Sequence, residues 1–131
     1  MAITAKKRVG NLGESIAEKY LLRKGFKILA RNYRKPWGEI DIIAEKGSVI
    51  RFIEVKTVSR ETLPGVTREN SGPEYRAEEL VHEQKLRKLA RTAEIYMHDH
   101  RLDADYQIDA VAVYLSTRER KARCFLYEQI L

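Results

Sequence analysis

Hydrophobic residues recur at helical spacing in two stretches of the chain. In residues 6–24 they stand three and four positions apart, and Gly25 follows where a helix would end. Residues 77–98 carry a second stripe of the same kind. Both patterns are typical of amphipathic helices that bury one face against a core.

Five shorter stretches have the composition of β-strands, with β-branched and aromatic residues between turn-forming residues. In chain order they cover residues 26–33, 39–44, 48–56, 106–115 and 122–130. Only turns separate the first three, which predicts an antiparallel meander. The order αβββαββ indicates a single α/β domain over residues 1–131.

Residues 57–76 lack periodicity and hold two prolines and two glycines, so we expect a long loop that is either functional or disordered.

The composition is that of a globular protein rather than a disordered or membrane-spanning one. The 131 residues are 44% hydrophobic and 34% charged, and no apolar run approaches the roughly 20 residues that cross a bilayer. The basic start lacks the apolar segment of a signal peptide. Cys124 is the only cysteine, so we expect a buried bystander and no intrachain disulfide. These features favour a cytoplasmic protein with no membrane partner.

Positive charge is concentrated in the first half of the chain. Residues 1–60 hold 14 Lys and Arg against 6 Asp and Glu, a net +8, whereas residues 61–131 hold 11 against 13, a net −2. This favours binding to the phosphate backbone of DNA, with RNA also open, although a solvated basic surface explains the charge equally well. The residues expected to contact nucleic acid are Lys6, Lys7, Arg8, Arg31, Arg34, Lys35, Trp37, Gln84 and Lys85.

Three of these residues have open alternatives. Trp37, between a proline and a glycine, either stacks on a base or caps the edge of the core. Gln84 and Lys85 begin the exposed face of the second helix, where they either assist the site or are merely solvated.

Four charged side chains are expected to share one face of two neighbouring strands. Because residues two apart in a strand share a face, Glu39 and Asp41 project together, as do Glu54 and Lys56. A turn centred on residues 46–47 would place Glu39 roughly opposite Glu54. Three carboxylates in apolar strands are costly unless they are compensated, and a hard divalent cation such as Mg²⁺ would compensate them.

A cation held there would acidify an attacking water and stabilise the transition state of phosphodiester hydrolysis. Lys56, two residues from Glu54, would orient or deprotonate that water. The alternative is a set of ordinary salt bridges on a solvated sheet face, with Lys56 paired to a carboxylate and Glu39 paired to Arg34 or Lys35.

The spacing of Asp41 before Glu54-Val55-Lys56 resembles the D…(D/E)xK signature of restriction-endonuclease-like nucleases. Further matching segments are Gly10-Asn-Leu-Gly-Glu14, Asn32-Tyr-Arg34, Gly38-Glu-Ile-Asp-Ile-Ile43 and Phe52-Ile-Glu-Val-Lys-Thr57. On these segments the chain resembles the bacterial YraN-type, UPF0102-like family of predicted endonucleases, which is similar in fold to archaeal Holliday-junction resolvases. The resemblance covers almost the whole chain. It implies a restriction-endonuclease-like α/β fold with a mixed central sheet flanked by helices.

The resemblance also implies roles for individual residues. Asp41 and Glu54 would bind Mg²⁺ or Mn²⁺, Lys56 would be the catalytic lysine, and Glu14 would contact the metal directly or through water. Glu14 has the ordinary alternative of a first-turn glutamate favoured by the helix dipole. Glu39 joins these candidates on shared-face geometry alone.

The function that the resemblance implies is a metal-dependent endonuclease acting on structured or branched DNA as a homodimer. The alternative is a nucleic-acid-binding module that keeps the nuclease fold without catalysis. Asp109, in an apolar strand, is interpreted as a structural carboxylate with a partner such as an arginine or a backbone cap.

Overall fold

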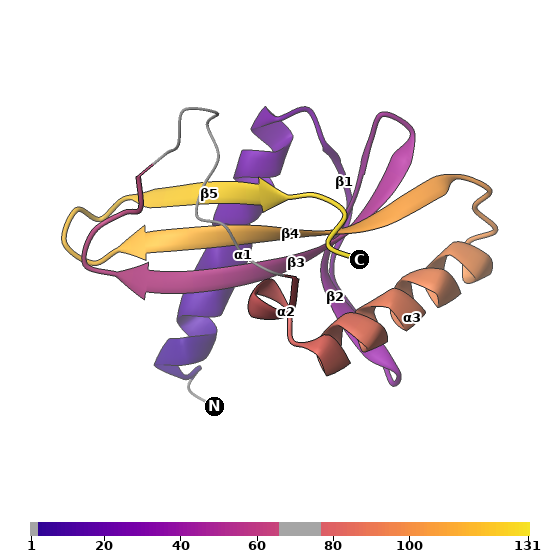
Figure 1. The fold of residues 1–131 in the computed structure, drawn as a ribbon, viewed down its shortest axis with the longest axis horizontal. Coiled ribbons are helices and arrows are strands. Elements are labelled where there is room, and N and C mark those ends of the chain that lie inside the picture. The colour runs from indigo at the N-terminus through magenta and orange to yellow at the C-terminus, as the bar shows by residue number, and fades with distance from the viewer. Residues whose placement is uncertain (1–2, 66–76) are drawn as a thin grey trace.

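The structure is a computed structural model that describes residues 3–65 and 77–131. Its elements are drawn in Figure 1. In chain order they are α1 (Ala5–Arg23), β1 (Lys27–Lys35), β2 (Gly38–Lys46), β3 (Val49–Arg60), α2 (Ala77–Leu80), α3 (Glu83–Asp99), β4 (Asp105–Ser116) and β5 (Ala122–Tyr127).

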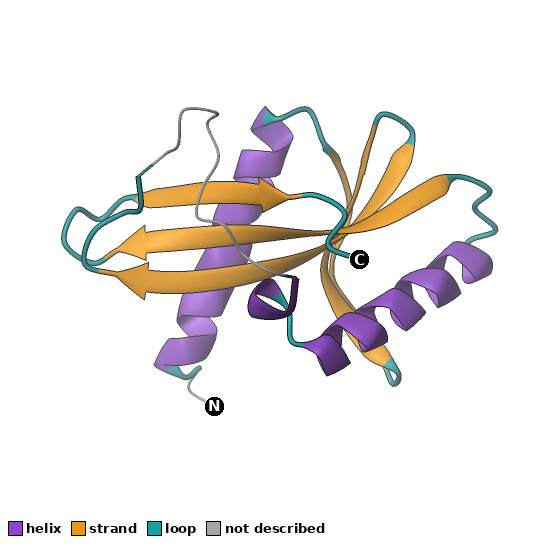
Figure 2. Cartoon of the chain, viewed as in Figure 1, coloured by secondary structure: helices purple, strands orange, loops and turns teal. Residues whose placement is uncertain are grey.

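The strands form one sheet in the order β1-β2-β3-β4-β5. The first three are antiparallel, β4 runs parallel to β3 after the crossover through α3, and β5 is antiparallel to β4. In Figures 1 and 2, α1 passes behind β3, β4 and β5, and α3 covers the opposite face of the sheet. The predicted α/β fold of order αβββαββ, with a mixed central sheet flanked by helices, is confirmed.

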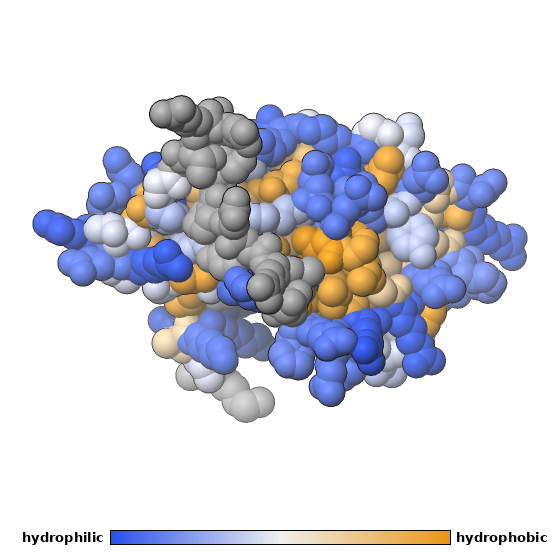
Figure 3. Space-filling model, viewed as in Figure 1, coloured by the Kyte–Doolittle hydropathy of each residue, from blue (hydrophilic) through white to orange (hydrophobic). Residues whose placement is uncertain are grey.

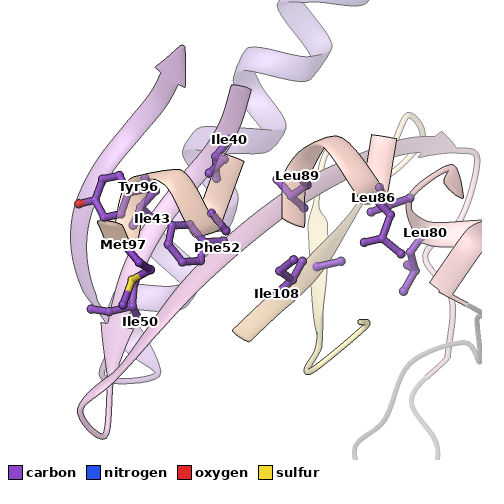
Figure 4. Close-up of a cluster of buried hydrophobic side chains, with 13 residues drawn as sticks. Ile40, Ile43, Ile50, Phe52, Leu80, Leu86, Leu89, Tyr96, Met97 and Ile108 are labelled. Atoms are coloured by element: carbon purple, nitrogen blue, oxygen red, sulfur yellow. The ribbon is translucent and has the colours of Figure 1, made fainter. Parts of the chain in front are cut away.

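Two hydrophobic cores lie on opposite faces of the sheet. Beneath α3, Leu89 packs with Phe52 and apolar side chains of β2 (Figure 4). On the other face, Leu21 of α1 packs with Ile42 and apolar side chains of β3 and β4. The neighbouring residues Ile42 and Ile43 therefore belong to different cores, which explains why β2 is apolar without alternation.

The second predicted helix is divided in two. α2 ends at Leu80 and α3 begins at Glu83. His82 caps α3, because its Nδ1 accepts a hydrogen bond from the N–H of Gln84 at 3.4 Å. Val81, just before the cap, is buried in the core beneath α3. The break between α2 and α3 could not be predicted from the sequence, because the apolar pattern continues through it.

β3 is longer than predicted. It pairs with β4 as far as Arg60, because Thr57 and Val58 find partners in Val113 and Tyr114. The prediction that a loop begins at residue 57 is therefore wrong. The later part of that predicted loop, residues 66–76, lies outside the described residues.

The turn between β2 and β3 is centred one residue later than predicted. Gly47 and Ser48 have positive φ angles of 59° and 61°, as the two central residues of a tight hairpin turn require. Lys46 therefore pairs with Val49. This turn fixes the register of the two strands that carry the candidate site.

The corrected register changes which carboxylates face each other. The β2–β3 ladder ends at the pair Ile42–Ile53, and the next position brings Asp41 opposite Glu54. The prediction that Glu39 lies opposite Glu54 is wrong, because it placed the turn one residue too early.

The predicted alternation along β2 also fails near Asp41. Ile40 belongs to the core beneath α3 and Ile42 to the core beneath α1, although residues two apart ordinarily share a face. On β1, Asn32 falls opposite Asp41 in the register and adopts a left-handed backbone with φ 50°. Regular pleating is thus interrupted on both strands at the level of Asp41.

Hydrophilic side chains cover most of the surface seen in Figure 3, and hydrophobic ones gather in a central area. None of the helices within the described ranges is long and apolar enough to cross a membrane.

Candidate functional site

Asp41 lies where β2 parts from β3. Beyond the last ladder pair, Ile42–Ile53, its Oδ2 accepts a hydrogen bond from the backbone N–H of Val55 at 2.9 Å. The carboxylate thus bonds a backbone donor just where the ladder ends, and this bond holds the half-buried side chain in place.

Glu54 lies next to Asp41 and is buried, with 5% of its surface exposed. Its burial and the charge of Asp41 raise the pKa of Glu54 to about 7, although Lys85 acts in the opposite direction. Lys85, in the first turn of α3, forms an ion pair with Oε1 of Glu54. Burial lowers the pKa of Lys85, but the hydrogen bond and charge of Glu54 more than offset this, and the net shift is upward.

Glu14 approaches Asp41 from α1, on the other face of the sheet. Burial raises the pKa of Glu14 to about 7, together with the charge of Asp41 and a hydrogen bond to it. Oε2 of Glu14 is buried and has no hydrogen-bond partner. Nη2 of Arg31 lies 3.6 Å from that oxygen, an ion-pair distance too long for a hydrogen bond.

Gly13 allows α1 to bring Glu14 close to the sheet. A Cβ at Gly13 would lie 1.9 Å from Oγ1 of Thr57 on β3, so a larger residue would push the helix away. At Gly10, in the preceding turn, a Cβ would meet nothing within 4 Å. The glycine before Glu14 therefore has a packing role that its place in the sequence motif did not reveal.

The oxygen ligands of Glu14, Asp41 and Glu54 fit a hard divalent cation. Mg²⁺ is usually held by one or two carboxylates, with water and phosphate completing its shell. Oε2 of Glu14 accepts no hydrogen bond and two of the pKa values are raised, so negative charge here is incompletely compensated. In the described part of the chain, no group of three His, Cys, Asp or Glu side chains is arranged to hold an ion. The fit is therefore to a cation held by two of these carboxylates and water.

Lys85, a residue of α3, forms an ion pair with Glu54. Nζ of Lys56 donates a hydrogen bond to the backbone carbonyl of Glu79 at 2.6 Å, which links β3 to α2. The catalytic role expected of Lys56 stays a prediction. Sequence reasoning placed Lys85 on an exposed helix face and missed its ion pair, because the two residues meet only when α3 packs on the sheet.

Two other candidate residues, Glu39 and Arg31, form ion pairs near the carboxylate cluster. Glu39 is exposed and pairs with Arg34 at 3.6 Å, because it lies on the part of β2 that has left β3. Arg31 is half-buried and pairs with Glu18 at 3.0 Å and with Glu14 at 3.6 Å, which directs its guanidinium toward α1. Glu39 therefore lies in the wall of the groove that Lys85 also lines, and its role in catalysis stays a prediction. Arg31 pairs with two glutamates of α1.

A groove of about 620 Å³ opens between the β1–β2 turn and the first half of α3. It is lined by five residues predicted to contact nucleic acid, Arg34, Lys35, Trp37, Gln84 and Lys85, and by His82 and Lys88, which sequence reasoning missed. No sequence pattern marked the last two, because the groove exists only once the turn packs against α3.

A smaller cavity of about 380 Å³ lies between α1 and β3. Lys6, Glu14 and Thr57 are among the residues that line it, and Lys7 and Arg8 are exposed on the same turn of α1. The cluster of Glu14, Asp41 and Glu54 is thus flanked by the groove and by this cavity, and lysine side chains line both.

Asp109 lies apart from this cluster and is fully buried. Its Oδ2 accepts a hydrogen bond from Arg51 at 3.0 Å, and its Oδ1 accepts from the side chain of Gln107 at 2.8 Å and the backbone N–H of Gln129 at 2.9 Å. The interpretation of Asp109 as a structural carboxylate with an arginine partner is confirmed.

The fold and the site define a class of protein, a mixed α/β domain with an acidic cluster where two central strands part and a basic groove beside it. The sequence profile of the uncharacterised protein family UPF0102 matches residues 13–113, and the chain belongs to that family, as predicted. A UPF0102 protein of Campylobacter fetus is 36% identical over 104 residues, which cover 79% of this chain and 81% of the relative. Another, of Vibrio campbellii, is 34% identical over 122 residues, 91% of each chain.

Among solved structures, the Ca²⁺ complex of Pyrococcus furiosus SfsA is similar to this chain, with a TM-score of 0.40 and 20% sequence identity. The match covers 97% of this chain and 65% of the SfsA chain.

Proposed function

We propose that this protein is a Mg²⁺- or Mn²⁺-dependent endonuclease that hydrolyses phosphodiester bonds in structured or branched DNA. The observation that carries the proposal is the meeting of Glu14, Asp41 and Glu54 where β2 parts from β3, with burial and repulsion raising two of their pKa values to about 7. Without a cation such a cluster costs stability, and strongly shifted titratable groups gather at functional sites.

Asp41 and Glu54 would hold the metal, and Glu14 would reach it through water. When bound, the ion would lower the pKa of the attacking water and balance charge on the phosphate. Water attacks phosphorus, one P–O ester bond breaks, and the products are an alcohol and a phosphate monoester. Lys85 forms an ion pair with Glu54 in this structure, and with a metal on that carboxylate its ammonium would be available to pair with a substrate phosphate.

The basic first half of the chain, together with the lysines that line the groove and the smaller cavity, would hold the DNA backbone. Symmetric cutting of a branched substrate requires two active sites related by a twofold axis, so the proposal includes a homodimer.

The test is incubation with branched, flapped, single-stranded and duplex DNA in Mn²⁺, Mg²⁺ or EDTA. We expect cleavage of branched substrates only with metal, and its loss in Asp41→Asn and in Glu54→Gln. Glu45→Gln, also on β2, serves as the matched control and should cleave normally.

Binding without cleavage, in a protein that Mn²⁺ does not stabilise, would overturn the proposal. It would favour the second candidate, a non-catalytic nucleic-acid-binding module. The observation on its side is the ion pair of Lys85 with Glu54, which neutralises a proposed metal ligand.

A further inference from the structure

We infer that the groove beside Lys85 binds an unpaired nucleotide, with the base stacked on Trp37 and the flanking phosphates against the cations of the groove walls. The inference rests on the proposed function, since it names the feature of the substrate that the same site recognises. Its test, however, needs neither metal nor cleavage.

Trp37 is available for stacking. It lies in the turn between β1 and β2, lines the groove, and keeps 39% of its surface exposed. It belongs to none of the hydrophobic cores formed by the described residues. An exposed indole outside the core is the kind of surface on which bases of any sequence stack.

The turn that carries Trp37 is held firmly against α3. A Cβ at Gly38 would lie 2.2 Å from Oγ1 of Thr92, so the backbone of the turn approaches the helix more closely than any other residue would permit. Thr92 is itself fixed, because its hydroxyl donates to the carbonyl of Lys88 at 2.7 Å. The backbone of the turn is therefore packed closely on α3, and the groove volume of about 620 Å³ lies within the range of small-ligand sites.

Cations stand on both walls of this groove. Arg34 and Lys35 come from the turn side, where Arg34 is paired with Glu39 of the same wall. Lys85 and Lys88, three residues apart on one face of α3, come from the helix side, where Lys85 is paired with Glu54. An aromatic platform between lines of cations is the arrangement with which proteins hold single-stranded nucleic acid.

The stacking geometry selects unpaired bases. In an intact duplex both faces of a base are covered by its neighbours, so an indole reaches a base face only at a single strand, flap, bulge or branch. Lys85 lines the groove and contacts Glu54, which places the stacked nucleotide next to the proposed cleavage site. The groove would thus separate structured DNA from plain duplex.

The fluorescence of Trp37 reports on this groove directly, because it is the chain's single tryptophan. The wild-type protein is titrated in EDTA with a single-stranded deoxyoligonucleotide, a blunt duplex, and the same duplex with one bulged nucleotide. We expect the single strand and the bulged duplex to quench the fluorescence and the blunt duplex to leave it unchanged. Equal quenching by the blunt duplex, or none by the single strand, overturns the inference.

Variants test the same point through the anisotropy of labelled oligonucleotides. Trp37→Ala should weaken binding of the single strand roughly tenfold or more, and Trp37→Phe should restore most of it. The control is Tyr106→Ala, since Tyr106 is 43% exposed and lines a different groove with Arg87 and Arg91. Unchanged affinity in Trp37→Ala, or an equal loss in Tyr106→Ala, contradicts the inference.

Two further comparisons test whether the groove distinguishes ribose from deoxyribose, and separate this inference from the proposed function. Quenching by single-stranded RNA of the same sequence would support a site that reads base and phosphate without regard to the sugar. A preference for unpaired bases without metal-dependent cleavage retains the inference and rejects the nuclease. Cleavage of branched DNA with unchanged Trp37 fluorescence rejects the inference alone.

Discussion

At the scale of single residues, Asp41 interacts with carboxylates that arrive from opposite faces of the sheet. Asparagine can keep the hydrogen bond from the N–H of Val55, so Asp41→Asn removes a charge with little change of shape. Because the repulsion on Glu14 and Glu54 falls, we expect the metal-free variant to be more stable than the wild type by about 1–2 kcal/mol at pH 8.

Thermal melts of both proteins, in EDTA and with Mg²⁺ or Mn²⁺, measure this effect. The wild type should gain stability from the metal, since a cation that binds only the folded state stabilises it, and Asp41→Asn should not. A variant that melts well below the wild type in EDTA would instead identify Asp41 as part of a structural network.

The positive charge of Lys85 compensates the negative charge of the buried Glu54, and this stabilisation should depend on pH. The pKa of Glu54 is raised to about 7 from 4.5, so the stability that its protonation contributes is present below pH 4.5 and lost as pH rises through 7. Lys85 limits that loss by pairing with the charged form. Lys85→Met should therefore destabilise the metal-free protein by about 1 kcal/mol at pH 8, since solvent screens the half-exposed ammonium.

At pH 5, where Glu54 is protonated in the fold, the same substitution should cost little. Urea unfolding at the two pH values measures the difference. Lys88→Met, which removes another lysine from the same groove, is the control and should change little at either pH. A loss from Lys85→Met that is equal at pH 5 and pH 8 would show that its packing, and not its charge, stabilises the fold.

At the scale of elements, the position of α1 on β3 decides whether Glu14 reaches Asp41. Gly13→Ala places a methyl group 1.9 Å from Oγ1 of Thr57, and we expect it to destabilise the protein by about 1–3 kcal/mol. Because the helix must shift, the stabilisation by Mg²⁺ should also shrink.

Gly10→Ala is the matched control within the same helix. Its methyl group would meet nothing within 4 Å, so the better helix propensity of alanine should stabilise the protein by up to about 1 kcal/mol. Unfolding curves of the two variants, with and without Mg²⁺, give the comparison. Equal stability of both variants would mean that α1 does not need its close approach.

At the scale of the whole molecule, the basic first half should make DNA binding strongly dependent on salt. Replacing Lys6, Lys7 and Arg8 together with alanine should weaken binding to all sequences alike and reduce the slope of log K against log salt by roughly 2–3. Anisotropy titrations over a range of salt concentrations measure that slope.

The matched triple variant replaces Arg118, Arg120 and Lys121, three exposed cations in the β4–β5 turn, with alanine. It removes the same formal charge from a turn of the sheet instead of from α1. We expect its slope to stay close to that of the wild type. Equal losses from both variants would mean that net charge, and not its position, drives binding.

The sequence by itself determined the element order and the identity of the central carboxylates. Each helix buries one face, so its apolar residues recur at helical spacing in the sequence whichever element the helix packs against. Asp41 and Glu54 could be selected because charged residues inside apolar strands are costly without compensation. The concentration of Lys and Arg in residues 1–60 also needed no structure.

Only the tertiary structure decided which of these groups meet. The positive φ angles of Gly47 and Ser48 set the register that turns Asp41, and not Glu39, toward Glu54. The ion pair of Lys85 with Glu54 and the groove under Trp37 join elements that are distant in sequence. Such contacts depend on turn geometry and on how closely helices approach the sheet, and neither leaves a periodic trace in a single sequence.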